Sequence, residues 1–104
     1  MRRGEVWWAE LPAPAGRRPV VLLSRDEAYA VRELVTVAPL TTQIRRIPSE
    51  VSLGRDDGLP RRCVANLDTI TTIPKRALSE RLAVLSPARR AAVDRALRFA
   101  LGLV

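Results

Sequence analysis

The segment Arg17-Arg18-Pro19 carries the side chains best suited to binding a phosphate. It directly precedes the continuous apolar run 20–23, so it places guanidinium groups at the start of a buried strand. A guanidinium is a planar fork that can donate two hydrogen bonds to a phosphate at once. Pro19 restricts the preceding residue to an extended backbone and so fixes where the Arg18 side chain leaves the chain.

A second polar segment complements the first. Thr41, Thr42 and Gln43 end another apolar strand with two hydroxyls and an amide, and Arg45 and Arg46 follow closely. Hydroxyls and guanidinium groups can orient a phosphate and stabilise negative charge that develops on it. Each segment taken alone is more typical of a solvated strand end than of a phosphate site.

Several kinds of catalysis are excluded by composition. The chain has no histidine, which rules out Ser-His-Asp, Cys-His and paired-histidine ribonuclease mechanisms. Cys63 is the only cysteine, and Asp56, Asp57 and Asp68 do not form a recognisable cluster of converging carboxylates for a two-metal nuclease. No metal or other cofactor is therefore expected.

The length and charge indicate one small basic domain, residues 1–104. Formal net charge is +7, and all but one of the 18 basic residues are arginine. This balance favours a polyanion partner, although an arginine-rich genome with a solvated surface would look the same. With a single cysteine and no apolar run near the roughly 18 residues of a membrane span, a soluble cytoplasmic protein is expected, with no membrane contact.

Hydrophobic patterning predicts a mainly β protein with one clear helix. Ser86 is a good N-cap before Pro87, and Gly102 a good stop after an amphipathic segment, so a helix is expected over about 87–101. Five to seven short strands then give a small, strongly twisted β-barrel or sheet capped by this helix, an α+β arrangement. The strands are expected at 5–11, 19–24, 34–40 (ended or bulged by Pro39), 49–53, 63–67 and 69–73 (bent near Asn66 or Asp68), and 79–85, with a turn of helix or an irregular loop within 25–33 and a short helical turn at 74–77.

The two tryptophans are adjacent in the first strand. Trp7 and Trp8 must therefore point to opposite faces of the sheet. At least one belongs to the core or an interface, and the other is available to stack on a nucleobase.

The order of these pieces resembles the MazF/PemK family of toxin endoribonucleases. The resemblance covers essentially the whole chain, and five short motifs in the right order make it fairly specific. They are Arg2-Arg3-Gly4-Glu5-Val6-Trp7-Trp8, Arg18-Pro19-Val20-Val21, Val37-Ala38-Pro39-Leu40-Thr41, Asn66-Leu67-Asp68-Thr69-Ile70 with Ile73-Pro74-Lys75, and Leu85-Ser86 leading to Leu101-Gly102-Leu103.

This resemblance implies a CcdB/PemK-like fold, an SH3-like twisted barrel, working as a homodimer. It implies cleavage of single-stranded or loop RNA without a metal, leaving a 2′,3′-cyclic phosphate and a 5′-hydroxyl, and a cognate acidic antitoxin. The catalytic arginine and threonine of the family fall on Arg18 and Thr41. Since the nucleophile is the 2′-hydroxyl of the substrate, DNA should not be cut. The remaining RNA contacts are expected from Arg17, Thr42, Gln43, Arg45 and Arg46.

One departure from the family lies in the loop 12–17. Many relatives carry a longer loop with an acidic residue there, so their base preference does not transfer to this chain. A shorter loop would open the groove, and structured tRNA or rRNA then joins mRNA as a candidate substrate. Two other functions remain open: a gyrase-poisoning toxin of the CcdB kind, and a basic RNA-binding module that does not cleave.

Overall fold

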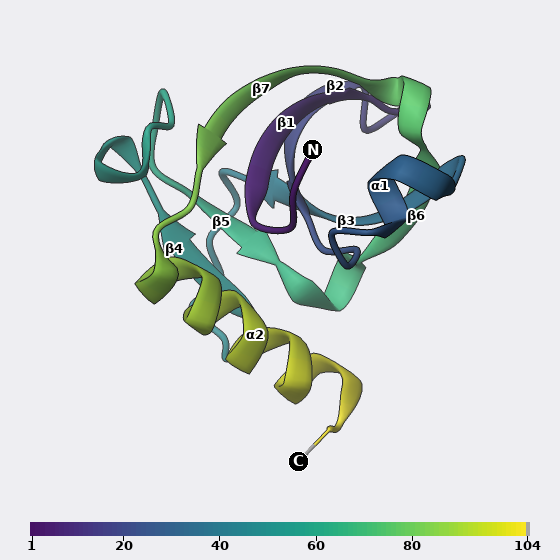
Figure 1. The fold of residues 1–104 in the computed structure, drawn as a ribbon. Coiled ribbons are helices and arrows are strands. Elements are labelled where there is room, and N and C mark those ends of the chain that lie inside the picture. The colour runs from purple at the N-terminus through teal and green to yellow at the C-terminus, as the bar shows by residue number, and fades with distance from the viewer. Residues whose placement is uncertain (104) are drawn as a thin grey trace.

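Seven antiparallel strands form a single sheet in the computed structural model, which describes residues 1–103 (Figure 1). Neighbouring strands follow the order β4-β5-β3-β2-β1-β7, and β6 pairs with part of β3. The strands are β1 (Glu5–Glu10), β2 (Arg17–Leu22), β3 (Leu34–Thr41), β4 (Glu50–Leu53), β5 (Cys63–Asn66), β6 (Thr71–Pro74) and β7 (Leu78–Val84).

The sheet curls strongly but stays open. Figure 1 shows β1, β2 and β7 sweeping around one end of the molecule, while β4 and β5 lie beside the C-terminal helix. Within residues 1–103 no pairing joins β4 to β7, the two ends of the strand path. The predicted mainly β fold with a C-terminal helix is therefore confirmed, in the form of an open twisted sheet.

The C-terminal helix α2 (Pro87–Leu101) begins and ends where the sequence predicts. The Ser86 hydroxyl accepts a hydrogen bond from the Arg89 amide at 3.2 Å, and Gly102 closes the helix with a positive φ of 70°. Val93 and Ala96 are buried and face the sheet. Neither described helix is long and apolar enough to span a bilayer.

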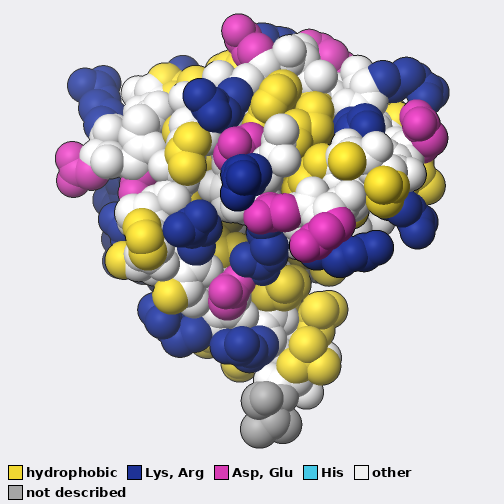
Figure 2. Space-filling view, in the orientation of Figure 1, with side chains coloured by type: hydrophobic (Ala, Val, Ile, Leu, Met, Phe, Trp, Pro, Cys, Tyr) yellow, Lys and Arg dark blue, Asp and Glu magenta, His cyan; other side chains and the backbone are white. Residues whose placement is uncertain are grey.

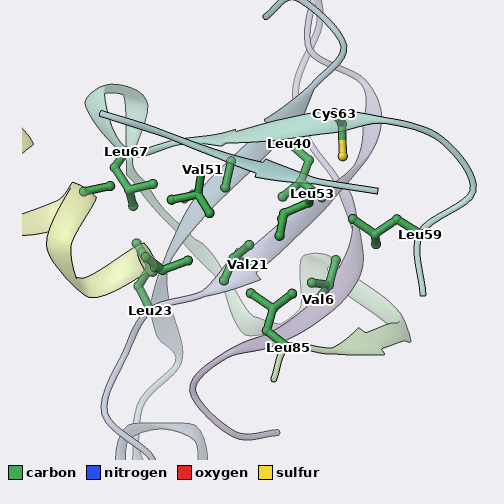
Figure 3. Packing of buried hydrophobic residues seen from close by; sticks show 14 residues of the cluster. Val6, Val21, Leu23, Leu40, Val51, Leu53, Leu59, Cys63, Leu67 and Leu85 are labelled. Carbon is green, nitrogen blue, oxygen red and sulfur yellow. The ribbon is translucent and has the colours of Figure 1, made fainter. Parts of the chain in front are cut away.

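The central strand β2 is buried on both faces, as its continuous apolar run predicts. Val21 belongs to a first core cluster under α2, whereas Val20 and Leu22 belong to a second cluster on the other face. Figure 3 shows part of the first cluster, with Leu40, Leu59 and Cys63 grouped at one end of it. Such burial is the main source of stability in a chain with four large aromatic residues.

Strand β3 continues through Pro39 instead of ending or bulging there. The Thr36 carbonyl accepts a hydrogen bond from Leu23 at the end of β2, so alternation turns the backbone nitrogen of Pro39 toward the opposite edge. On that edge β3 pairs with β6 up to Val37 and with β5 from Leu40 onward. The missing N–H of Pro39 thus falls where β3 changes partners, and the strand extends to Thr41.

The short segments that connect the strands contain the helical turns and the bend that the sequence predicts. The segment 25–33 contains one helical turn, α1 (Ala28–Val31), and the expected bend after β5 is the 3₁₀ turn η2 (Leu67–Thr69). The Asn66 side chain caps this turn by accepting from the Asp68 amide at 2.9 Å. Two further 3₁₀ turns are η1 (Arg55–Asp57) and η3 (Lys75–Ala77), the latter within the segment predicted as a short helical turn.

Candidate active site

The pairing of β2 with β3 brings the two predicted catalytic residues to facing positions. Val20 lies opposite Pro39 and Val21 opposite Ala38. Continuing this antiparallel register by two residues sets Arg18 opposite Thr41. The two segments that the sequence identifies as phosphate-binding are thus neighbours on the sheet, at the ends of strands fixed by a buried core.

Arg18 and Thr41 form a ridge between two hollows in the surface. One hollow, of about 280 Å³, is bordered by both residues and by Trp8, and we call it the tryptophan hollow. The other, of about 370 Å³, is bordered by the same two residues and by Asn66, and we call it the asparagine hollow. A phosphodiester bound on the ridge would leave room for one nucleotide on either side.

The short β1–β2 loop holds the Arg18 side chain in place. The loop closes on itself through a hydrogen bond from the Leu11 amide to the Gly16 carbonyl at 3.1 Å, and Gly16 takes the positive φ of 64° that the turn requires. Arg18 Nε donates to the Ala15 carbonyl at 3.3 Å. Its terminal nitrogens have no protein acceptor within residues 1–103 and remain available to a phosphate.

The Thr41 hydroxyl is prepared to act as a donor. Its Oγ1 accepts a hydrogen bond from the Gln43 amide at 3.1 Å. With that lone pair engaged, the hydroxyl proton is free to point at a neighbouring acceptor. A guanidinium and a hydroxyl therefore converge on the ridge as hydrogen-bond donors.

The other predicted contacts divide between the two hollows. Thr42 borders the tryptophan hollow, whereas Gln43 and Arg45 border the asparagine hollow. Arg46 borders neither and adopts a left-handed backbone conformation, with φ of 59°. The role of these residues in RNA binding stays a prediction.

Glu50 fixes the segment that carries these residues, and the sequence analysis did not identify it. One carboxylate oxygen accepts hydrogen bonds from the Arg45 amide at 3.0 Å and the Arg46 amide at 2.9 Å. Its other oxygen is buried and has no hydrogen-bond partner among residues 1–103. In the sequence Glu50 looks like an ordinary strand residue, and only its position a few residues after a basic segment hints at this role.

We expect Glu50→Ala to loosen this segment without touching the ridge. Losing two charge-assisted hydrogen bonds should lower the free energy of unfolding by about 1–3 kcal/mol and raise KM for RNA roughly tenfold, with a smaller change in kcat. Glu50→Gln keeps an acceptor oxygen and serves as the matched variant. Steady-state kinetics and thermal unfolding measure both effects, and an unchanged KM in Glu50→Ala would contradict the role given to Glu50.

Arg17 is not brought together with Arg18 and Thr41. It is exposed on the opposite side of the strand, where it forms ion pairs with Glu10 at 3.1 Å and Glu80 at 3.4 Å. Its guanidinium carbon lies 4.3 Å from the centre of the Trp8 ring. Arg17 borders neither hollow, and its predicted contact with RNA stays a prediction.

The two tryptophans occupy opposite faces, as expected. Trp7 packs against the second core cluster, and its indole nitrogen donates to Glu5 at 2.9 Å. Trp8 is half-buried and borders the tryptophan hollow. Trp8 is therefore the tryptophan available to a ligand.

Cys63 lies at the floor of the tryptophan hollow but is a poor nucleophile. Its residue is 6% exposed, and burial raises the pKa of the thiol, with Asp57 raising it further. The thiol therefore stays neutral near neutral pH, while the thiolate is the reactive form.

The acidic residues have separate structural duties. Asp57 accepts hydrogen bonds from the Gly54 amide and from Arg89, and Asp68 accepts one from the Ser49 hydroxyl. Within residues 1–103, no three carboxylate or thiol side chains lie close enough together to hold a metal ion. The groups available on the ridge are Arg18 and Thr41.

Comparison with known proteins connects this geometry to one family. Residues 2–101 match the family described as PemK-like, MazF-like toxins of type II toxin–antitoxin systems. Over 99 residues, the chain is 46% identical to the probable endoribonuclease MazF5 of Mycobacterium tuberculosis, covering 94% of this chain and 90% of that protein.

Solved structures agree with the sequence match. The M. tuberculosis toxin MazF-mt6 superposes with a TM-score of 0.89 at 30% identity, over 96% of this chain and 98% of that one. A mycobacterial endoribonuclease solved in complex with its cognate antitoxin also gives 0.89, at 31% identity, over 100% and 97% of the two chains. The chain therefore belongs to the PemK-like, MazF-like toxin family of type II toxin–antitoxin systems.

Proposed function

We propose that this chain is the toxin of a type II toxin–antitoxin system and acts in the cytoplasm as a metal-independent, sequence-selective endoribonuclease that inhibits translation. The observation that carries this proposal is the ridge of Arg18 and Thr41, set between two nucleotide-sized hollows in a chain of this family. The relatives compared above are named as endoribonucleases or as a toxin.

The proposed reaction uses a nucleophile supplied by the substrate. The 2′-oxygen attacks the adjacent phosphorus, the bond from phosphorus to the 5′-oxygen breaks, and the products are a 2′,3′-cyclic phosphate and a 5′-hydroxyl. The 2′-hydroxyl loses its proton and the leaving 5′-oxygen gains one. No histidine is present to carry either proton.

Arg18 and Thr41 have distinct tasks in this reaction. The terminal nitrogens of Arg18 donate to the non-bridging phosphate oxygens and offset the charge that develops in the transition state. The Thr41 hydroxyl donates to the same group and aligns it for in-line attack. Since a guanidinium stays protonated at neutral pH, we assign Arg18 first to charge stabilisation and only second to proton transfer.

The proposed partners follow from the family. One structural relative was solved with its cognate antitoxin, and we propose an acidic antitoxin that covers the ridge. The family resemblance also implies a homodimer. A basic chain is a suitable target for an acidic partner, since opposite charges speed association and favour the correct partner.

One experiment separates the proposed function from its alternatives. Purified protein is incubated with total RNA in EDTA, and new 5′-hydroxyl ends are mapped. Discrete ends at a recurring short sequence, absent with Arg18→Ala, support the endoribonuclease. RNA binding without new ends would instead identify a non-cleaving RNA-binding module, and gyrase-linked DNA breaks would identify a gyrase poison.

The salt dependence of binding tests the electrostatic part of the proposal. Figure 2 shows acidic side chains interspersed among the basic ones on the face of the molecule in view, so net charge alone does not define a binding surface. Three arginines border the hollows: Arg18, Arg45 and Arg61.

We expect log K for a non-cleavable RNA to fall with log salt concentration with a slope of about −2, from roughly 0.7 per phosphate contact. Fluorescence anisotropy at several salt concentrations measures this slope. A flat response would contradict binding through the phosphates.

A further inference from the structure

We propose that the tryptophan hollow is a pocket for the nucleobase next to the scissile phosphate, with Trp8 as its stacking platform and Arg17 as the residue that positions Trp8. This inference rests on the proposed function and adds the site that binds one base of the substrate. Arg17 then acts through Trp8 and does not contact the phosphate.

The lining of the hollow suits a flat, largely apolar ring. Its floor is made by Leu40, Leu59 and Cys63, which belong to the first core cluster and are each less than 10% exposed. Figure 3 shows these three side chains together at one end of the cluster. Trp8 and Pro19 border the same hollow. At about 280 Å³ it lies near the lower end of the range for small-molecule pockets, which suits one ring system better than an extended ligand.

The position of the hollow places such a ring beside the reacting phosphate. Arg18 and Thr41 border the hollow as well as forming the ridge. Arg61 and Thr42 border it too and are exposed, so polar groups are available to the edges of a base. A nucleotide whose phosphate lies on the ridge can therefore put its base into this apolar hollow.

Trp8 is held ready for stacking before any ligand binds. The guanidinium of Arg17 lies over the ring, 4.3 Å from its centre, and is itself held by Glu10 and Glu80. A cation stacked on one face of an indole restrains its rotamers. Because Arg17 lies over one face of the Trp8 ring, the rest of the ring is what can border the hollow. Stacking of a base on an aromatic side chain is sequence-tolerant and typically changes affinity about 5- to 150-fold.

Abasic substitution tests the pocket directly. An RNA oligonucleotide containing a mapped cleavage site is prepared with each base beside the scissile phosphate removed in turn. With the wild-type protein, removal of one of these bases should raise KM at least tenfold. In Trp8→Leu the intact oligonucleotide should already bind weakly, and removing the same base should change KM by less than about twofold. Trp8→Phe should restore most of the difference, because it keeps an aromatic face.

Arg17→Met distinguishes positioning of Trp8 from direct contact with the phosphate. If Arg17 acts through Trp8, this variant should raise KM for the intact oligonucleotide and leave the abasic one nearly unchanged. An equal rise for both substrates would show that Arg17 contacts the phosphate and would overturn its positioning role.

Fluorescence gives a readout that does not depend on cleavage or on a stable Trp8→Leu protein. In a Trp7→Phe background the emission comes from Trp8 alone, and a stacked base should quench it. Quenching is expected with an oligonucleotide carrying a 2′-deoxy scissile nucleotide, and its abasic counterpart should not quench.

Each negative result points to a different error. Unchanged Trp8 emission, or the same abasic penalty in wild type and Trp8→Leu, would overturn the proposed base pocket. If the protein still cleaves RNA, the proposed endoribonuclease function would stand. Failure to cut any RNA would overturn the proposed function itself.

Discussion

Arg18→Ala is expected to lower kcat/KM for RNA cleavage by about a thousandfold. Removing one preorganised donor from a site of developing negative charge typically costs 10²–10³ in rate, and Arg18 supplies a full positive charge besides its hydrogen bonds. The fold should survive, because the Arg18 side chain makes one hydrogen bond in the described part of the chain, to the Ala15 carbonyl at 3.3 Å. Single-turnover cleavage of a defined oligonucleotide measures the loss.

Two matched variants show whether the loss belongs to the site. Arg18→Lys keeps the charge but loses the planar fork, so it should recover only part of the rate. Arg32→Ala removes an exposed arginine beside α1, away from the ridge, and should leave the rate within about twofold of wild type. Activity of Arg18→Ala near that of Arg32→Ala would contradict a catalytic role for Arg18.

Thr41→Val should produce the second largest loss, about a hundredfold in kcat with little change in KM. Valine keeps the shape and the β-branched backbone preference of threonine but removes the hydroxyl donor. The effect should appear in kcat because the hydrogen bond strengthens as charge develops on the phosphate. Thr41→Ser should retain most of the activity.

The matched control for this variant lies on the same strand. Thr36→Val removes a hydroxyl whose one hydrogen bond within residues 1–103 joins it to Thr72, and Thr36 borders neither hollow. Its activity should stay close to wild type. The double variant Arg18→Ala/Thr41→Val should lose less than the product of the single losses, because both residues act on the same phosphate. Full additivity would indicate that they act on separate steps.

Local signals in the sequence account for the elements that the structure confirms. The helix α2 is marked by Ser86, Pro87 and Gly102, whose effects extend over a single turn of backbone. The apolar run in β2 predicts burial on both faces for the same reason. Arg18 and Thr41 lie near the ends of β2 and β3, and the resemblance to the MazF/PemK family singles them out as catalytic. The pairing of β2 with β3 then brings both residues to the same two hollows.

Features that depend on distant parts of the chain could not be predicted. The change of partner at Pro39 needs both β5 and β6 in place, so the sequence indicates an end to the strand where none exists. The floor of the tryptophan hollow includes Leu59 and Cys63, which no spacing rule connects with Trp8.

Two side-chain roles were hidden for the same reason. Glu50 supports the segment around Arg45 by accepting hydrogen bonds from backbone amides. Because almost any residue type has a backbone amide, the sequence of that segment gives no sign of this contact. Arg17 looks equivalent to Arg18 in sequence, but strand alternation sends it to the other face, toward Glu80.

The most direct test of the proposed chemistry is a single atom change in the substrate. A defined RNA oligonucleotide is compared, in EDTA, with the same oligonucleotide lacking only the 2′-hydroxyl at the scissile nucleotide. We predict that the first is cut to give a 2′,3′-cyclic phosphate and a 5′-hydroxyl, and that the second is bound but not cut. Cleavage of the 2′-deoxy oligonucleotide at the same bond would contradict attack by the 2′-oxygen at the ridge of Arg18 and Thr41.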